Sequence, residues 1–134
     1  MRLFSYARAI LLAIAVAISG AASAAAFEQK KFDPASFKAA QGSNKSILVD
    51  ISATWCPTCK AQHAVLQSLA TKPEYADLVV FEVDFDTQKD AVRSFGARQQ
   101  STLIAFKGTQ ETRRLVGETG AAPIEELLKS SLKK

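Results

Sequence analysis

Residues 46–60 read SILVDISATWCPTCK, an apolar run interrupted by one acid and followed by two cysteines separated by two residues. A continuous apolar run of this length is typical of a strand buried on both faces of a parallel sheet. Residues 59 to about 70 then place apolar side chains at helical spacing. We therefore predict a buried strand over 46–52, a helix ending near Ala70, and the cysteine pair at their junction.

The rest of the chain alternates in the same way between helices and strands. Asp33 followed by Pro34 is a good helix start, because aspartate caps free N–H groups and proline fits the first turn. Further elements are expected as a strand over 78–84, a helix over 90–95, strands over 102–107 and 112–116 joined near Gly108, and a helix over 123–132. This order predicts an α/β fold, with a mixed central sheet and helices on both faces.

The two cysteines, Cys56 and Cys59, are the only ones in the 134-residue chain. A disulfide that closes so short a loop restricts the unfolded chain little, because the entropic gain grows with loop length. A purely structural bridge is therefore a poor use of the pair, and the spacing favours redox chemistry.

The position of the motif assigns different roles to the two sulfurs. Cys56 falls at the N-cap of the helix and Pro57 at its first position, where a missing N–H costs nothing. Free backbone N–H groups and the positive end of the helix dipole favour a thiolate at Cys56. We expect Cys56 to attack a disulfide and Cys59 to resolve the mixed disulfide.

Asp50 lies six residues before Cys56 in the apolar strand. Burial disfavours the charged form of a carboxyl, so Asp50 is a candidate acceptor for the proton of Cys59 when that sulfur attacks. The alternative is a solvated acid at the end of the strand.

These residues resemble the active-site strand and helix start of the thioredoxin superfamily. FDPASFKAA (32–40), VVFEVDFD (79–86), FGARQQSTLIAF (95–106) and the glycine after RRLV resemble the other segments of that fold, so the likeness covers nearly all of residues 25–134. The resemblance implies a thiol–disulfide oxidoreductase that needs no cofactor and acts on protein disulfides. By the same resemblance the redox-active disulfide is Cys56–Cys59 and Asp50 is the buried acid. The substrate-binding positions that it implies are Trp55, Ser101, Thr102 and Gly117.

Three positions depart from the family pattern. Pro57-Thr58 between the cysteines resembles the oxidase branch in its proline only, because that branch has a histidine where Thr58 stands. An uncharged Thr58 stabilises the thiolate less, so we expect a reductant or isomerase partner, not a primary oxidase. Glu82 stands where many members carry a lysine near the buried acid, and two carboxyls there would couple.

The third departure is Ser101, which replaces the cis-proline of the loop that faces the disulfide. A cis bond before a residue other than proline costs about 2.5–4 kcal/mol, so either a strained cis bond or a return to trans is expected. Either outcome changes a loop whose backbone pairs with substrate. The Ser101 hydroxyl is also expected within reach of the sulfurs.

The N-terminus has the pattern of a secretory signal peptide. Arg2 and Arg8 precede an apolar run, and Ala22-Ser23-Ala24 fits a cleavage site, so we assign 1–24 to the signal with cleavage near 24–26 and 25–134 to the domain. An uncleaved membrane anchor is the alternative. Export predicts a periplasmic protein, and resemblance to exported reductases implies a membrane thiol-electron transporter that re-reduces it. The formal net charge of +4 is dispersed, so nucleic acid is not expected as a partner, and we expect a monomer.

His63, the only histidine, permits a second hypothesis. Together with Cys56 and Cys59 it offers three ligands suited to copper or zinc, which would make the protein a metal carrier. A structural zinc site would need a fourth ligand. The simpler interpretation is an exposed or half-packed helix histidine.

Overall fold

The computed structural model describes residues 26–133, so the expected signal peptide and its cleavage site lie outside the described residues. A five-stranded sheet in the order β1-β3-β2-β4-β5 forms the centre. β3 is parallel to both β1 and β2, whereas β4 is antiparallel to both β2 and β5. The strands are β1 (Glu28–Lys31), β2 (Ser46–Ser52), β3 (Val79–Asp84), β4 (Thr102–Lys107) and β5 (Gln110–Val116).

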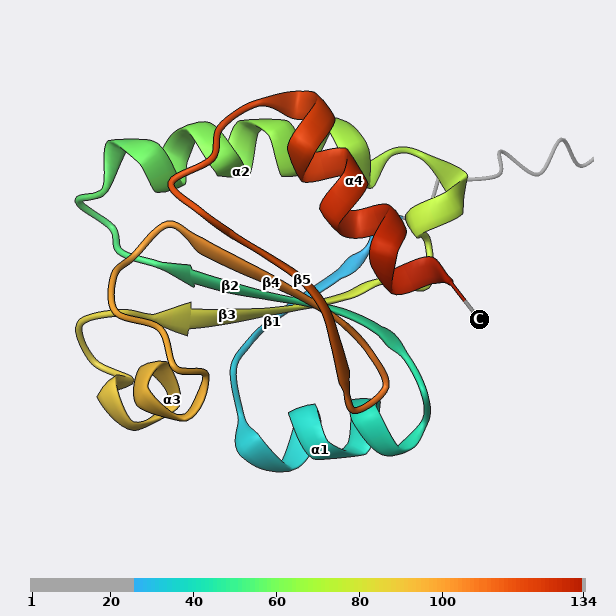
Figure 1. Ribbon diagram of the computed structural model, residues 1–134, viewed down its shortest axis with the longest axis horizontal. Coiled ribbons are helices and arrows are strands. Elements are labelled where there is room, and N and C mark those ends of the chain that lie inside the picture. The colour runs from blue at the N-terminus through green and yellow to red at the C-terminus, as the bar shows by residue number, and fades with distance from the viewer. Residues whose placement is uncertain (1–25, 134) are drawn as a thin grey trace, which may run out of the picture.

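Helices cover both faces of this sheet, which confirms the predicted α/β architecture (Figure 1). The helices are α1 (Pro34–Gly42), α2 (Pro57–Ala70), α3 (Lys89–Ser94) and α4 (Ala121–Leu132), with a 3₁₀ turn at Pro73–Tyr75. α2 and α4 lie on one face, and α1 and α3 lie on the other (Figure 1). None of the helices between residues 26 and 133 is long and apolar enough to span a membrane.

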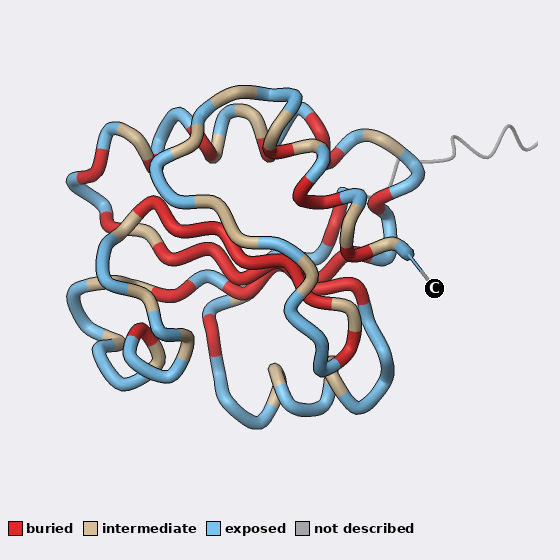
Figure 2. The backbone as a smooth tube through the Cα atoms, viewed as in Figure 1, coloured by how far each residue is buried: buried red, intermediate tan, exposed pale blue. Residues whose placement is uncertain are grey.

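Burial is concentrated in the central strands, as Figure 2 shows. In β2 every residue from Ser46 to Ile51 is buried. Its alternate side chains enter two hydrophobic clusters, one that includes Leu66 of α2 and Leu127 of α4, and one rich in phenylalanine that extends to Phe37 of α1. The sheet therefore holds the carboxyl end of β2, and the cysteine motif that follows it, on a rigid base.

The predicted elements are confirmed, apart from their ends and one strand. β1 is not predicted because its sequence, EQKK, is polar and its strand is at the edge of the sheet, where an apolar pattern is not required. α4 begins at Ala121, two residues before the predicted start, because Pro123 lies in the first turn where its missing N–H has no intrahelical partner to lose.

Candidate active site

Cys56 is the N-cap of α2, as the sequence predicts. Its Sγ accepts a hydrogen bond from the backbone N–H of Cys59 at 3.1 Å, and Pro57 occupies the first turn. The two cysteines form a disulfide with their Cα atoms 5.3 Å apart. Cys56 is 4% exposed and Cys59 is 1% exposed, and both pack with Ala53 and Phe85. A sulfur at this helix end receives the favourable dipole and N–H groups expected for an attacking thiolate.

Asp50 lies buried on β2, with only 2% of the residue exposed. The alternative of a solvated acid at the strand end is therefore wrong. Its Oδ2 lies 2.7 Å from Nε2 of His63, and its Oδ1 is buried without a hydrogen-bond partner in the protein. The carboxyl thus has one oxygen bound to the imidazole and one oxygen free.

His63 of α2 lines the same cavity as the cysteines and has a partner that the sequence does not reveal. Its side chain is 40% exposed, so it is half-packed as the simpler interpretation expects, but it is also paired with the buried acid. The hydrogen bond to Asp50 raises the pKa of His63 above its ordinary value of 6.5, and partial burial acts in the opposite direction. The negative charge of Glu82 adds to the increase. His63 therefore keeps its proton to a higher pH than a free histidine does, because its pKa is raised.

Glu82 stands on β3 in register with Asp50, as expected of a residue near the buried acid. Its side chain is exposed, whereas Asp50 is buried. Asp50 therefore has a histidine partner from α2, while the neighbouring strand supplies a second carboxylate instead of a lysine.

The metal-carrier hypothesis gains no support from this arrangement. Between residues 26 and 133, no three His, Cys, Asp or Glu side chains are grouped so that they could hold a metal ion. Nε2 of His63 is directed to Asp50, and the two sulfurs are joined to each other.

The loop that enters β4 brings Ser101 and Thr102 next to Gly117, which follows β5. The bond before Ser101 is trans, as no peptide bond in the described part of the chain is cis, and Ser101 has a φ of 56°. This left-handed conformation is unusual for a residue with a Cβ atom. The Ser101 carbonyl accepts from the N–H of Gly117 at 2.9 Å, and Gly117 itself has a φ of 69°.

The hydroxyl groups of this loop are bound to its own backbone. Oγ of Ser101 donates to the carbonyl of Gln100 at 2.6 Å, and Oγ1 of Thr102 donates to the carbonyl of Gln99 at 2.9 Å. The expectation that the Ser101 hydroxyl is available to the sulfurs is therefore not supported.

Gln62 is a site residue that the sequence does not reveal. It is fully buried on α2, and its Nε2 donates to the carbonyls of Ser101 at 3.1 Å and Glu118 at 2.9 Å. The side chain thereby joins two loops that are far apart in sequence. Gln62 lies among the buried residues of α2. Its polar side chain on this apolar face is the only sign in the sequence that it could have a special role.

Trp55 is 59% exposed beside Cys56, and its Nε1 donates to Oδ2 of Asp86 at 2.7 Å. The ring is therefore not part of the hydrophobic core. The exposed ring next to the buried disulfide is an available contact surface for a docking polypeptide.

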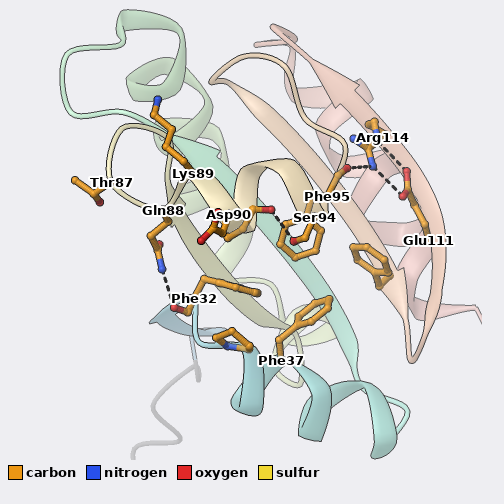
Figure 3. A pocket seen from close by; sticks show the side chains of 13 residues that line it. Phe32, Phe37, Thr87, Gln88, Lys89, Asp90, Ser94, Phe95, Glu111 and Arg114 are labelled. Atoms are coloured by element: carbon orange, nitrogen blue, oxygen red, sulfur yellow. Dashed lines mark hydrogen bonds and ion pairs between the residues drawn. The ribbon is translucent and has the colours of Figure 1, made fainter.

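Two cavities lie near these elements. One, of about 600 Å³, is lined by both cysteines, Lys60, His63 and Glu82. The other, of about 830 Å³, lies over the phenylalanine cluster between α1 and α3, where α3 has only six residues (Figure 3). No cysteine lines the second cavity, so the redox chemistry belongs to the first.

The fold and this site define a thiol–disulfide oxidoreductase. The sequence model of the thioredoxin family matches residues 26–130. A thioredoxin of Mycobacterium tuberculosis is 43% identical over 82 residues, which cover 61% of this chain and 70% of the relative. The chain belongs to the thioredoxin family.

Solved structures agree with this assignment. A protein named Trxlp from Edwardsiella tarda is 44% identical with a TM-score of 0.73, and the match covers 75% of this chain and 98% of that protein. A thioredoxin pre-protein from Schistosoma mansoni is 28% identical with a TM-score of 0.63, over 78% of this chain and 96% of that one.

The first prediction concerns the Asp50–His63 pair. Asp50→Asn removes the carboxylate that raises the pKa of His63, so the imidazole should titrate at a lower pH in the variant than in the wild type. Nuclear magnetic resonance can follow this titration without ambiguity, because the chain has one histidine. Equal midpoints in the two proteins would contradict the pairing.

The same pair predicts a dependence of stability on pH. Because the pKa of His63 is raised in the folded state, its contribution to the free energy of unfolding is complete below 6.5. That contribution is lost as the pH rises through the folded-state pKa. Denaturant titrations should show this loss in the wild type and not in Asp50→Asn.

The second prediction concerns the link made by Gln62. Gln62→Leu removes two hydrogen bonds of about 1 kcal/mol each, which should loosen both loops. Amide exchange near residues 101–102 and 117–120 should become roughly fivefold faster, because each loop loses one bond of about 1 kcal/mol and about 1.4 kcal/mol corresponds to a factor of ten. Gln67→Leu, at an exposed position of the same helix, is the matched control. Equal acceleration in both variants would show that Gln62 does not hold these loops.

Proposed function

We propose that this thioredoxin-family protein is an exported reductant of protein disulfides. The observation that carries the proposal is the placement of Cys56 at the N-terminus of α2, bonded to Cys59 and adjacent to the strand that holds the buried Asp50. This arrangement separates an attacking sulfur from a resolving sulfur. The chain's own side chains supply the thiol, the proton acceptor and the docking surface.

The reaction has two steps. The Cys56 thiolate attacks one sulfur of a substrate disulfide, and the other substrate sulfur leaves with the electron pair as a thiolate. Cys59 then loses its proton and attacks Sγ of Cys56, which releases the second substrate sulfur and closes the Cys56–Cys59 disulfide. Two electrons pass to the substrate, and Asp50 takes the proton of Cys59.

Substrate docking is assigned to the surface around the disulfide. Trp55 supplies an exposed aromatic ring, and the resemblance to the family assigns backbone contacts with substrate to the Ser101–Thr102 loop and Gly117. An extended segment of an oxidised protein could pair with this backbone in the manner of an added strand. The carbonyl of Ser101 is already occupied by Gly117 and Gln62, so backbone groups other than this carbonyl must make the contact.

The reducing direction is favoured by the absence of charge at position 58. A strong oxidant has a reduced form that is specially stabilised, and Thr58 adds no positive charge to stabilise the Cys56 thiolate. Export is supported by Arg2 and Arg8, the apolar run after them and the Ala22-Ser23-Ala24 site. In the periplasm the protein would depend on a membrane thiol-electron transporter for its electrons.

The third prediction tests this mechanism with two cysteine variants. Cys56→Ser should abolish the reduction of insulin disulfides, because no nucleophile remains at the helix terminus. Cys59→Ser should instead accumulate mixed disulfides with the substrate, visible on non-reducing gels and removed by a small thiol. Unchanged insulin reduction by Cys56→Ser would exclude the mechanism.

The protein for this experiment is recovered from the periplasmic fraction of cells that express residues 1–134. Its intact mass then reports processing, and a chain that begins at residues 25–27 is expected. A full-length protein retained in the membrane would contradict cleavage and favour the anchored form.

A further inference from the structure

The two oxygens of Asp50 have different surroundings. Oδ2 is hydrogen-bonded to Nε2 of His63 at 2.7 Å, and Oδ1 is buried with no hydrogen-bond partner in the protein. A buried carboxylate is costly unless it is paired. The imidazole therefore pairs with the buried carboxyl and fixes its orientation, while Oδ1 stays available to accept a proton.

His63 also connects the buried acid with solvent. It lies on α2 one turn after Cys59, and residues four apart in a helix lie on the same side. Its ring is 40% exposed and lines the cavity of about 600 Å³ that both cysteines line. A proton on this ring can pass to water, whereas a proton on Asp50, which is 2% exposed, has no direct route.

Other charged groups also face this cavity. Glu82 and Asp84 of β3 are the acids, and Lys60 of α2 and Lys31 of β1 are the bases. None of these four groups is hydrogen-bonded to His63, whereas Asp50 is. The hydrogen bond to Asp50 is also the largest influence on the pKa of His63, which it raises.

We propose that His63 positions Asp50 for the resolving step and carries the released proton from Asp50 to solvent. The proposal rests on the proposed function, because it requires Cys59 to attack the Cys56 mixed disulfide. As the Cys59–Cys56 bond forms and the Cys56–substrate bond breaks, the proton of the Cys59 thiol moves to Oδ1 of Asp50. The electron pair of the broken bond leaves on the substrate sulfur.

The carboxyl is then restored by His63. Once Asp50 is protonated, the neutral ring exchanges through water to the tautomer that carries its proton on Nδ1, which leaves Nε2 free to accept the carboxyl proton. The ring is then an imidazolium paired with the carboxylate, and Nδ1 releases its proton to water. An imidazolium that is already present cannot accept this proton. The positive charge of an imidazolium also opposes the arrival of a further proton at the Asp50–His63 pair. The resolving step should therefore slow as the pH falls through the pKa of His63, and the attack by Cys56 should not show this dependence.

The test separates the two steps with a chromogenic aromatic disulfide. The processed protein is reduced and then mixed with an excess of the reagent. Cys56 attacks the disulfide of the reagent and releases one aromatic thiolate in a first phase. Cys59 releases the second aromatic thiolate in a slower first-order phase. Stopped-flow absorbance gives both rates as a function of pH.

His63→Gln keeps an amide that can donate to Oδ2 but does not titrate. We expect its second phase to be about tenfold slower at neutral pH and to lose the inflection assigned to His63, with the first phase unchanged. This loss is smaller than the hundredfold or more that general acid–base catalysis can contribute, because Asp50 remains. Gln67→Ala, an exposed change one turn further along α2, should match the wild type in both phases.

A second variant separates chemistry from a structural role. His63→Ala leaves a space beside Asp50, and free imidazole added to the solution should accelerate its second phase. An unchanged second phase and pH profile in His63→Gln, or no rescue of His63→Ala by imidazole, would overturn the role of His63. Absence of the first phase in the wild type would instead overturn the proposed function itself.

Discussion

The site depends on one constraint, which is that the most deeply buried strand of the sheet carries a carboxylate. β2 is hydrogen-bonded to a strand on each edge and is covered on both faces, so Asp50 has no access to bulk water. A charge in this position must be paired by a neighbouring element. His63 of α2 supplies the partner, and this interaction links the sheet to the helix that carries both cysteines.

Helix α2 therefore has several functions along a short segment. Its N-terminus presents Cys56 to free backbone N–H groups, and its first turn buries Cys59. Gln62 then reaches across to the loops opposite the disulfide, and His63 reaches down to the sheet. Because one helix carries all four side chains, a small shift of α2 would move both cysteines and change the contacts of Gln62 and His63 together.

The sequence predicts the parts of this arrangement that have local causes. The apolar run of β2, the cysteines with Pro57 and the alternation of elements are sufficient for the α/β fold and the redox pair. The pairing of His63 with Asp50 is not predictable, because it depends on how α2 lies across the sheet and not on spacing along the chain.

Other features escape sequence reasoning for similar physical reasons. Gln62 acts through carbonyl groups, which carry no sequence signature, and β1 is polar because it is at an edge. The sequence leaves both a strained cis bond and a trans bond before Ser101 open. The structure has the trans bond, with a positive φ at Ser101. The common cause is that long-range contacts, unlike helix caps and buried strands, are set by the tertiary fold.

We propose a reducing role for this site, because neither Thr58 nor the paired Asp50–His63 unit adds a net positive charge that would hold Cys56 as a thiolate. The most direct measurement is the reduction potential of the Cys56–Cys59 couple, obtained by equilibrating the processed protein with glutathione buffers and following Trp55 fluorescence. We expect a value near that of thioredoxin, about −270 mV. A value near −120 mV, typical of a strong oxidant, would contradict it.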